Sequence, residues 1–382
     1  MSLTTSEPTV ADLTRSIEAW LVERGPALAE QWARTRSIDD EVAYLRTLWA
    51  SLWDSGLSRW GWPATAGGLG GSPTLRAVLA EQLARADLAP TFATMPEVLA
   101  APLLAAAPEL SAQFVPAYLR GEDWWCQGFS EPGAGSDLAG LRTAAVADGD
   151  DFVVNGQKIW TTLAHHAQRC VLLVRTGSRE RAHKSLTLLF VDMDSPGITV
   201  RPITASTGEP EFSEVFFTDV RVPAARVIGA VDGGWPIVMS ILSCERATVF
   251  WGRVAWMQNR LAALVADAPA TDGAAKAIGE SFQLIAALRA RSLETQHAVA
   301  EGRFNAIESS IDKVLMAAAE QSLFDTATQI IGDDIAFGAG PDDVRMRKDY
   351  VMSRVATVYG GTAEIQRNII AERLVGLPRA GA

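Results

Sequence analysis

Apolar residues recur at helical spacing over the first third of the chain. Two such faces stand out before a loop rich in Gly and Pro, 61–71, and the same spacing resumes after it. The first face comprises Leu13, Ile17, Trp20 and Leu21, and the second Val42, Leu45, Leu48, Trp49 and Leu52. This pattern predicts an N-terminal α-helical domain over residues 1–120.

The pattern changes to short apolar or alternating runs between residues 121 and 231. Each run is bounded by Asp, Gly or Pro, which interrupt strands and initiate turns. The runs cover 152–154, 171–174, 186–191, 198–203 and 212–217. We expect a middle β domain of barrel or sandwich type.

Helical spacing returns after residue 232. The segments 236–266, 274–300, 304–330, 341–357 and 362–374 are rich in Ala and carry Arg and Glu on one side. Helices of such length predict a four-helix bundle over 232–382. A chain of 382 residues is too long for one ordinary core, so we expect an α+β multidomain protein.

Charge and cysteine content narrow the functional classes. A formal net charge of -11 argues against nucleic-acid binding as the main function. No apolar stretch is long enough to predict a membrane span, and the N-terminus lacks the pattern of a secretory signal. The three cysteines are scattered, which argues against a disulfide framework. The expected location is the cytoplasm.

Three motifs carry the candidate chemistry. Residues 130–137 read Ser-Glu-Pro-Gly-Ala-Gly-Ser-Asp, a loop whose successive backbone N–H groups suit anionic or carbonyl oxygens. Residues 154–162 read Val-Asn-Gly-Gln-Lys-Ile-Trp-Thr-Thr, and residues 360–370 begin Gly-Gly-Thr-Ala-Glu-Ile-Gln-Arg. In this order and spacing the motifs resemble the acyl-CoA dehydrogenase family, from about Trp62 to Pro378.

The resemblance implies a flavoenzyme with three domains in the order α, β, α. Such an enzyme removes the α proton of an acyl-CoA thioester while hydride leaves the β carbon for FAD. This chemistry needs a carboxylate base, an electron acceptor and donors to the thioester oxygen. The family's usual onward acceptor is an electron-transfer flavoprotein. Because this chain and coenzyme A are both negatively charged, binding must depend on local cations and N–H groups.

The resemblance also implies which residues meet FAD. The loop matching residues 127–136 lies along the flavin, Trp160 flanks its ring, and the Thr162 hydroxyl reaches N5. The other interpretation makes Trp160 a core aromatic and Thr162 an ordinary strand residue. The implied cofactor-binding residues are Gln127, Phe129, Ser130, Gly135, Ser136, Trp160, Thr162, Gln329, Gly332, Thr362 and Glu364.

The position of the catalytic base departs from the commoner family pattern. Many members have Glu just before the Gly-Thr of the C-terminal motif, where this chain has Gly360. A minority carry the base on the first long helix of the C-terminal domain, before an Arg, which matches Glu245 and Arg246. Gly360 then offers its N–H to the thioester oxygen, while Arg246 and Ser136 are candidate substrate-binding residues. The alternative for Glu245 and Arg246 is an ordinary surface pair.

A second departure concerns the segment that meets a neighbouring subunit's FAD. Residues 329–333 resemble it, but Asp333 replaces a Gly, and the family's Arg-x-x-Phe-Gly segment has no clear counterpart. A carboxylate near a pyrophosphate is unfavourable. The expected assembly is a homodimer, a homotetramer or a heterotetramer with a homologous subunit. We expect no metal site at His165 and His166, since adjacent strand residues point to opposite faces.

Two alternatives stay open. The chain could be a non-catalytic or half-site subunit of a hetero-oligomeric dehydrogenase, an interpretation favoured by Asp333. It could also be an acyl-CoA oxidase or flavin monooxygenase on the same fold. The sequence does not give the acyl chain, although a base on the helix and Gly360 favour branched, long or bulky groups.

Overall fold

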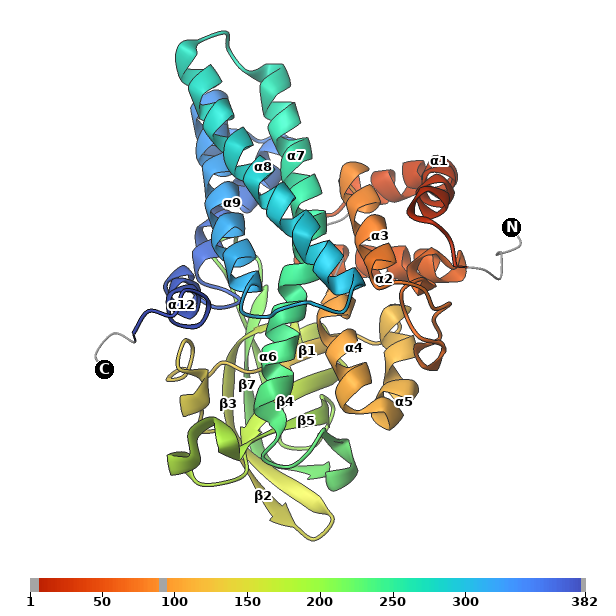
Figure 1. The fold of residues 1–382 in the computed structure, drawn as a ribbon, viewed down its shortest axis with the longest axis vertical. Coiled ribbons are helices and arrows are strands. Elements are labelled where there is room, and N and C mark those ends of the chain that lie inside the picture. Colours follow the sequence, from red (N-terminus) through yellow and green to blue (C-terminus); the bar gives the residue numbers. More distant parts are fainter. Residues whose placement is uncertain (1–6, 89–94, 379–382) are drawn as a thin grey trace. The chain divides into compact units, whose positions relative to one another are not determined.

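The computed structural model describes residues 7–88 and 95–378 and forms two compact units (Figure 1). One unit comprises 35–69 and 95–242, and the other comprises the described residues of 7–34, 70–88 and 243–378. The predicted α+β class is confirmed, with helices toward both ends of the chain and a β sheet in the middle. The N-terminal residues considered for a secretory signal begin at 1–6, outside the described part.

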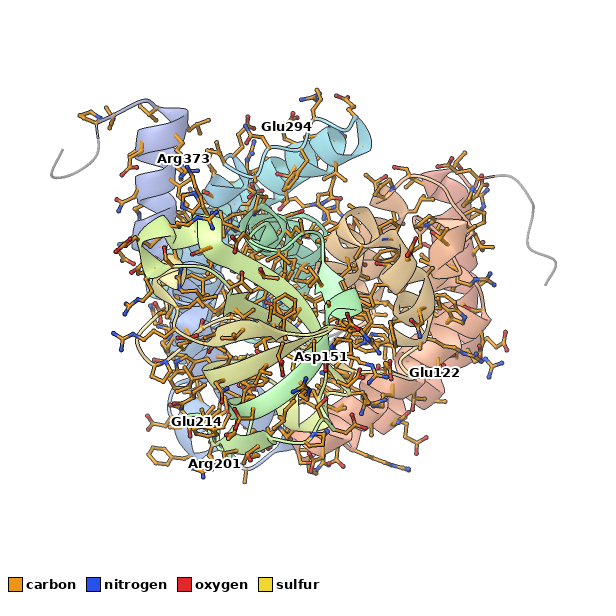
Figure 2. All side chains as sticks on the ribbon, turned by 90° about the horizontal axis from the view of Figure 1, so that it is seen from below. Glu122, Asp151, Arg201, Glu214, Glu294 and Arg373 are labelled. Carbon is orange, nitrogen blue, oxygen red and sulfur yellow. The ribbon has the colours of Figure 1, made fainter. Side chains whose placement is uncertain are left out.

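The first unit contains an eight-stranded sheet. Seven strands follow the order β6-β7-β3-β2-β4-β5-β8, and β1 pairs with β4 in parallel. Arg201 of β6 and Glu214 of β7 are register partners (Figure 2). The strands are β1 (Trp125–Gly128), β2 (Ala144–Asp148), β3 (Asp151–Thr162), β4 (Arg169–Arg175), β5 (Leu186–Asp192), β6 (Ile198–Ile203), β7 (Phe212–Pro223) and β8 (Val227–Ile228).

Alternation along these strands fills the core of the sheet. Val154 of β3 and Val220 of β7 are register partners and both are fully buried. Leu172 of β4 and Leu189 of β5 form a similar buried pair. Alternation of apolar and polar residues places one face of β3 and of β7 in the core, whereas β4 and β5 are buried along nearly their whole length. The sequence predicted apolar or alternating runs in five of the eight strands.

The β3–β7 pairing is irregular where the sequence places its flavin motif. The register shifts between Lys158 and Thr161, and Trp160 within this interval has a φ of 59°. A non-glycine residue in the left-handed region is strained, and bulges often redirect a side chain near a functional site. The Trp160 side chain is accordingly 58% exposed.

Among the described residues, three α-helices lie entirely within the same unit as the sheet. They are α2 (Ile38–Asp54), α4 (Met95–Ala106) and α5 (Pro108–Leu119). Ser37 caps α2 in a reciprocal capping box with Asp40, which explains where this helix begins. The first turn of α2 therefore carries three consecutive acidic residues, which interact favourably with the helix dipole.

The second unit is helical. Its long helices α7, α8 and α9 pack on one another around a shared apolar core that includes Val254, Leu288 and Leu323. The unit contains α1 (Val10–Ala33), α3 (Thr74–Arg85), α7 (Phe250–Asp267), α8 (Asp272–Ala300), α9 (Ser309–Ile331), α10 (Asp334–Phe337), α11 (Pro341–Ser353) and α12 (Ala363–Ile369). Helix α6 (Gly234–Cys244) leads from the first unit into the second.

The helix predicted over 236–266 is interrupted. Between α6 and α7 lies one turn of π-helix, Glu245–Val249. A π turn inserts an extra residue into the helical ladder and rotates the side chains that follow, which is why such turns are frequent at functional sites. Glu245, the candidate base, is the first residue of this turn.

The expectation for the adjacent histidines rested on a wrong local structure. The strand β3 ends at Thr162, and Leu163, with a φ of 52°, turns the chain into the 3₁₀ turn Ala164–His166. The two imidazoles therefore do not point to opposite faces; their ring centroids lie 4.3 Å apart.

Candidate active site

The flavin motif is built around a buried ion pair. Lys158 of β3 is fully buried, and its Nζ lies 2.8 Å from Oε1 of Glu131, the second residue of the motif loop. The ammonium also donates to the carbonyl oxygen of Phe129, at 3.0 Å. A single lysine thus ties both the entry of the loop and its acidic residue to the sheet.

The Glu131 carboxylate is satisfied on its other side as well. It accepts hydrogen bonds from the backbone N–H groups of Arg142 (2.6 Å) and Thr143 (2.8 Å), at the far end of the loop. Burial opposes ionisation, but the Lys158 ammonium and these donors hold the pKa of Glu131 below its usual range. Burial lowers the pKa of Lys158 to about 8, so both groups are charged at neutral pH.

The same contacts leave the middle of the loop free to meet a ligand. Gly135 and Ser136 are exposed, and nothing lies within 4 Å of a Cβ built on Gly135. The Ser130 carbonyl accepts from the N–H of Ile159, the residue after Lys158, which fixes the loop beside β3. The loop therefore offers backbone N–H groups and the Ser130 hydroxyl on a rigid support.

Trp160 and Thr162 stand on β3 immediately after this support. The interpretation of Trp160 as a core aromatic is wrong, since most of its side chain is exposed. Its ring touches Phe212 edge-on, with centroids 6.0 Å apart, and its outer face is open. A strained residue that exposes an indole fits a planar group stacked on it, and the residues present therefore fit an isoalloxazine.

The helical unit brings together the residues assigned to proton transfer. Arg246 lies 114 positions from Gly360 in the sequence, yet its Nη2 donates to the Gly360 carbonyl oxygen at 3.1 Å. A Cβ built on Gly360 would lie 3.3 Å from each carboxylate oxygen of Glu245. Gly360 has a φ of 62°, a conformation that glycine adopts without strain.

A lysine that the sequence did not single out completes this group. Lys313 of α9 is 1% exposed, and its Nζ donates to the Ala356 carbonyl oxygen at 2.7 Å. The ammonium also lies 3.8 Å from the ring centroid of Tyr359, the neighbour of Gly360. Lys313 and Arg246 thus hold the segment 356–360 at two points.

These cations also set the electrostatics of Glu245. Burial raises the pKa of the Glu245 carboxyl, while Lys313 and Arg246 oppose that rise. Burial likewise lowers the pKa of Lys313 to about 8, against the pull of Glu245 and Glu320. Glu320 itself is paired with Arg253 at 2.8 Å, so its charge is compensated. The surface-pair interpretation of Glu245 and Arg246 is wrong, because Arg246 is 7% exposed and Glu245 partly buried.

The remaining predicted residues fall into two groups. Thr362 caps α12, its Oγ1 accepting from the Ile365 N–H at 3.2 Å, and Glu364 follows it in the first turn. Gln329 and Gly332 lie at the opposite end of α9 from Ser309, which contacts Arg246 at 3.4 Å. Twenty residues of helix span roughly 30 Å, so the 329–333 segment and the base are far apart.

Comparison with known proteins identifies the family. The family models for the acyl-CoA dehydrogenase N-terminal, middle and C-terminal domains match residues 8–122, 126–220 and 232–375. The chain therefore belongs to the acyl-CoA dehydrogenase family of FAD-dependent oxidoreductases. Among the described residues, no helix combines the length and the apolar character needed to cross a membrane.

Individual relatives are similar over their whole length. Acyl-CoA dehydrogenase IpdE1 of Mycobacterium tuberculosis is 36% identical over 97% of this chain and 98% of its own. A solved structure, the Tcur3481-Tcur3483 steroid ACAD, is 26% identical with a TM-score of 0.85, covering 99% of this chain and 100% of its own. The ChsE4-ChsE5 complex from M. tuberculosis is 27% identical with a TM-score of 0.82 and full coverage of both chains.

The Glu131–Lys158 pair generates a prediction about cofactor retention. Replacing Lys158 with Met leaves a buried carboxylate without its counter-charge, which costs about 3–5 kcal/mol in free energy of unfolding. We expect Lys158→Met to purify with little FAD and to unfold at lower urea concentration. Lys276→Met, on an exposed lysine whose side chain is 76% accessible, is the control and should change neither quantity. Equal FAD content in both variants would contradict the role of the pair.

Trp160 generates a second prediction. Because its side chain is exposed, it should contribute little to folding stability, so a loss of FAD binding can be told apart from a loss of fold. Trp160→Ala should change the free energy of unfolding of the apoprotein by less than about 1 kcal/mol, yet weaken FAD binding measurably in a fluorescence titration. Trp20→Ala removes a side chain that is 8% exposed, so it should destabilise the fold by about 3–5 kcal/mol. The folded molecules of Trp20→Ala should bind FAD with the affinity of the native protein. Equal FAD affinity of Trp160→Ala and the native protein would show that the ring does not meet the flavin.

Proposed function

We propose that this chain catalyses the α,β-dehydrogenation of an acyl-CoA thioester to the trans-2-enoyl-CoA, with Glu245 as the base. The observation that carries the proposal is the position of the Glu245 carboxylate, 3.3 Å from where a side chain at Gly360 would begin. The Glu245 carboxylate thus lies beside position 360, where many members of the family carry their base, although Glu245 belongs to a different element of the chain. A Glu at 360 would collide with Glu245, so a glycine there suits the relocated base.

Three residues of this chain have different roles in proton transfer. Glu245 accepts the α proton on its carboxylate, and the Gly360 N–H donates to the thioester oxygen as negative charge develops on it. Arg246 holds Gly360 through its carbonyl oxygen, which orients the peptide unit next to the donor. The Ser130 loop with Trp160 and Thr162 would hold FAD, which would supply the acceptor for the hydride of the β carbon.

Lys313 and Arg246 are proposed to keep this base ionised. Without nearby cations, burial would raise the pKa of this carboxyl further and favour its protonated form. Because the base acts in its ionised form, flavin reduction should be lost as pH falls through the raised pKa of Glu245. The two cations limit that rise and extend the active range downward in pH.

The acyl group and the assembly are proposed with support from the relatives. One solved relative is a steroid ACAD, and a relative from Syntrophus aciditrophicus is a cyclohexane-1-carbonyl-CoA dehydrogenase, 26% identical over 88% of this chain. With glycine at 360, we propose a bulky, ring-bearing acyl chain for this protein as well. The ChsE4-ChsE5 and Tcur3481-Tcur3483 assemblies support a complex with a homologous subunit.

The second candidate is a subunit that shapes a partner's site without performing the reaction. Its supporting observation is the exposed Asp333 directly after Gly332, in the segment that the family uses at a neighbouring FAD. Electrons from the active form would pass to an electron-transfer flavoprotein or a similar acceptor. Flavin bleaching under anaerobic conditions distinguishes the two candidates.

The decisive variant is Glu245→Gln, which preserves size and hydrogen bonding but cannot take a proton. It should keep its FAD, while anaerobic flavin reduction slows by about 10²–10⁴-fold or more. The assay uses whichever of butyryl-, palmitoyl-, cyclohexanecarbonyl- and steroid side-chain CoA thioesters bleaches the native protein fastest. Glu280→Gln, on the exposed side of α8, is the matched control and should reduce normally. Normal bleaching by Glu245→Gln would place the base elsewhere, and no bleaching of the native protein with any thioester would favour the second candidate.

Lys313→Met tests the electrostatic part of the proposal. Without the ammonium, the pKa of Glu245 rises further, so the pH–rate curve for flavin reduction should move to higher pH. At neutral pH the rate should fall by roughly tenfold, equivalent to about 1.4 kcal/mol, and recover as pH increases. Lys313→Arg, which retains a cation facing Glu245 and Glu320, should stay close to the native curve. A uniform loss of rate at every pH would instead indicate a purely structural role for Lys313.

A further inference from the structure

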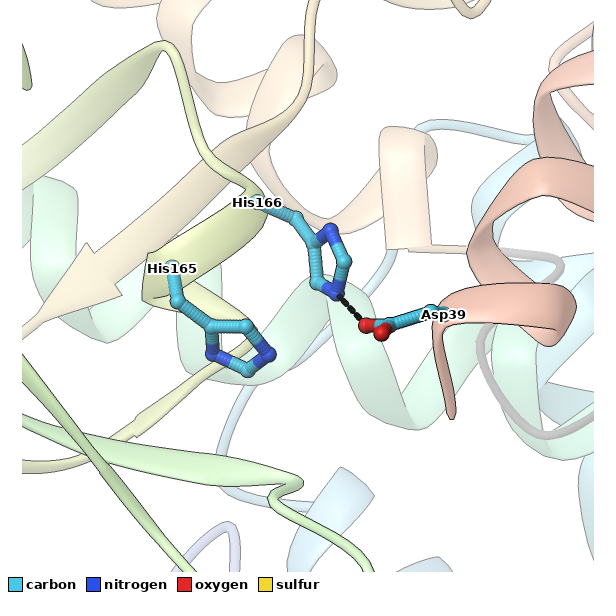
Figure 3. A group of neighbouring side chains, drawn as sticks. All are labelled: Asp39, His165 and His166. Carbon is cyan, nitrogen blue, oxygen red and sulfur yellow. Dashed lines mark ion pairs between the residues drawn. The ribbon is translucent and has the colours of Figure 1, made fainter. Parts of the chain in front are cut away.

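A group of three potential metal ligands lies in the β-sheet unit, outside the residues assigned above. His165 and His166 come from the 3₁₀ turn after β3, and Asp39 comes from the first turn of α2 (Figure 3). Nε2 of His166 lies 3.0 Å from Oδ1 of Asp39. One ligand atom from each of the three residues lies within 4.8 Å of the other two.

The protein encloses one nitrogen of each imidazole and leaves that of His165 without a hydrogen-bond partner. Nδ1 of His165 lies 3.2 Å from the Ser213 hydroxyl, which leaves Nε2 directed toward His166 and Asp39 (Figure 3). The Nε2 atoms of both histidines are shielded from solvent: Nε2 of His165 has no hydrogen-bond partner, and Nε2 of His166 faces the Asp39 carboxylate at 3.0 Å. Since buried polar atoms are nearly always satisfied, the Nε2 of His165 in particular suits a ligand.

The charge state of the rings suits a cation. Burial lowers the pKa of both imidazoles, and Asp39 opposes this only in part. Neutral imidazole is the form that coordinates metals, so neither ring has to lose a proton at neutral pH. Arg46 also lies close enough to lower the pKa of His166, and its charge limits the affinity of any cation bound here.

Two nitrogens and one oxygen are a donor set that suits tetrahedral coordination of a zinc-class cation. Ligand atoms about 2.0–2.2 Å from a tetrahedral Zn²⁺ are separated by roughly 3.4 Å. The His166–Asp39 contact of 3.0 Å already approaches this separation. The three ligand atoms lie within 4.8 Å of one another, so the His165 ring would shift inward to bind, and a water molecule would take the fourth position.

We propose that Asp39, His165 and His166 form a binding site for a divalent cation of the zinc class. The bound cation joins the start of α2 to the turn that follows β3. Because that turn begins shortly after Thr162, the cation steadies the end of the strand that carries Trp160 and Thr162. The site does not depend on Glu245 or on the proposed reaction.

The experiment is a titration of the full-length, chelator-treated protein with Zn²⁺ alone, followed by calorimetry and by melting temperature. We expect one equivalent to bind, and the melting temperature to rise because the cation binds the folded state only. Asp39→Asn changes one exposed oxygen and should keep the fold, yet weaken Zn²⁺ binding at least tenfold. His165→Ala and His166→Ala should do the same. Co²⁺ should give a visible absorption band of tetrahedral nitrogen and oxygen coordination in the native protein.

The chain has four histidines, and the two others supply the controls. His183 and His297 lie outside this group, in the 3₁₀ segment Arg179–Ser185 and in the last turn of α8, so His183→Ala and His297→Ala should bind Zn²⁺ as the native protein does. Absence of a one-equivalent site in the native protein would overturn the proposal. Equal affinity in native protein, Asp39→Asn and His166→Ala would overturn it too, since the cation would then bind at other surface groups.

Discussion

The flavin-binding half of this enzyme depends on one constraint, that a charge removed from water needs a partner of opposite charge. Lys158 is fully buried in β3, where an unpaired ammonium would cost several kcal/mol. Glu131 supplies the counter-charge, and the backbone at both ends of the motif loop satisfies what remains of the two groups. The loop's conformation follows from this arrangement, because its two ends must meet at the Glu131 carboxylate, with Lys158 on one side and Arg142 and Thr143 on the other.

The same constraint governs the base. Glu245 is partly buried with two cations, Lys313 and Arg246, and both also bind carbonyl oxygens of the segment 356–360. Position and charge are therefore coupled: a change that moves this segment also changes the field at Glu245. A buried base needs this support more than one beside solvent, because burial raises its pKa and favours the protonated form.

The sequence predicted the α+β class and the long strands well, since β3, β4, β5, β6 and β7 carry clear apolar or alternating runs. It missed β1, β2 and β8. Strand β1 has four residues and β8 only two, while β2, Ala144–Asp148, has small side chains and few apolar anchors, so none of the three shows strong alternation. The domain boundaries proposed from the sequence stay a prediction, because the structure forms two units that divide the N-terminal helices between them.

The motif residues were predictable by resemblance, but the residues that support them were only partly predictable from the sequence. A lone lysine inside a strand and a lone glutamate in a glycine-rich loop are a signal that could have identified the Glu131–Lys158 pair. Lys313 gave no such signal, because a lysine on an Ala-rich helix usually faces solvent. The prediction that the adjacent histidines point to opposite faces of a strand was wrong, because Leu163, with a left-handed backbone conformation, ends the strand before them.

The π turn at Glu245 connects these observations. In a regular α-helix from α6 into α7, each residue rotates by about 100°, and an inserted residue shifts the side chains that follow by the same amount. The sequence between α6 and α7 is helical in character throughout, so nothing in its periodicity reveals the insertion. Packing decides it: the turn starts where Glu245 approaches Gly360 and Arg246 reaches the Gly360 carbonyl oxygen. We infer that the irregularity persists because a regular helix could not direct both side chains to the same glycine.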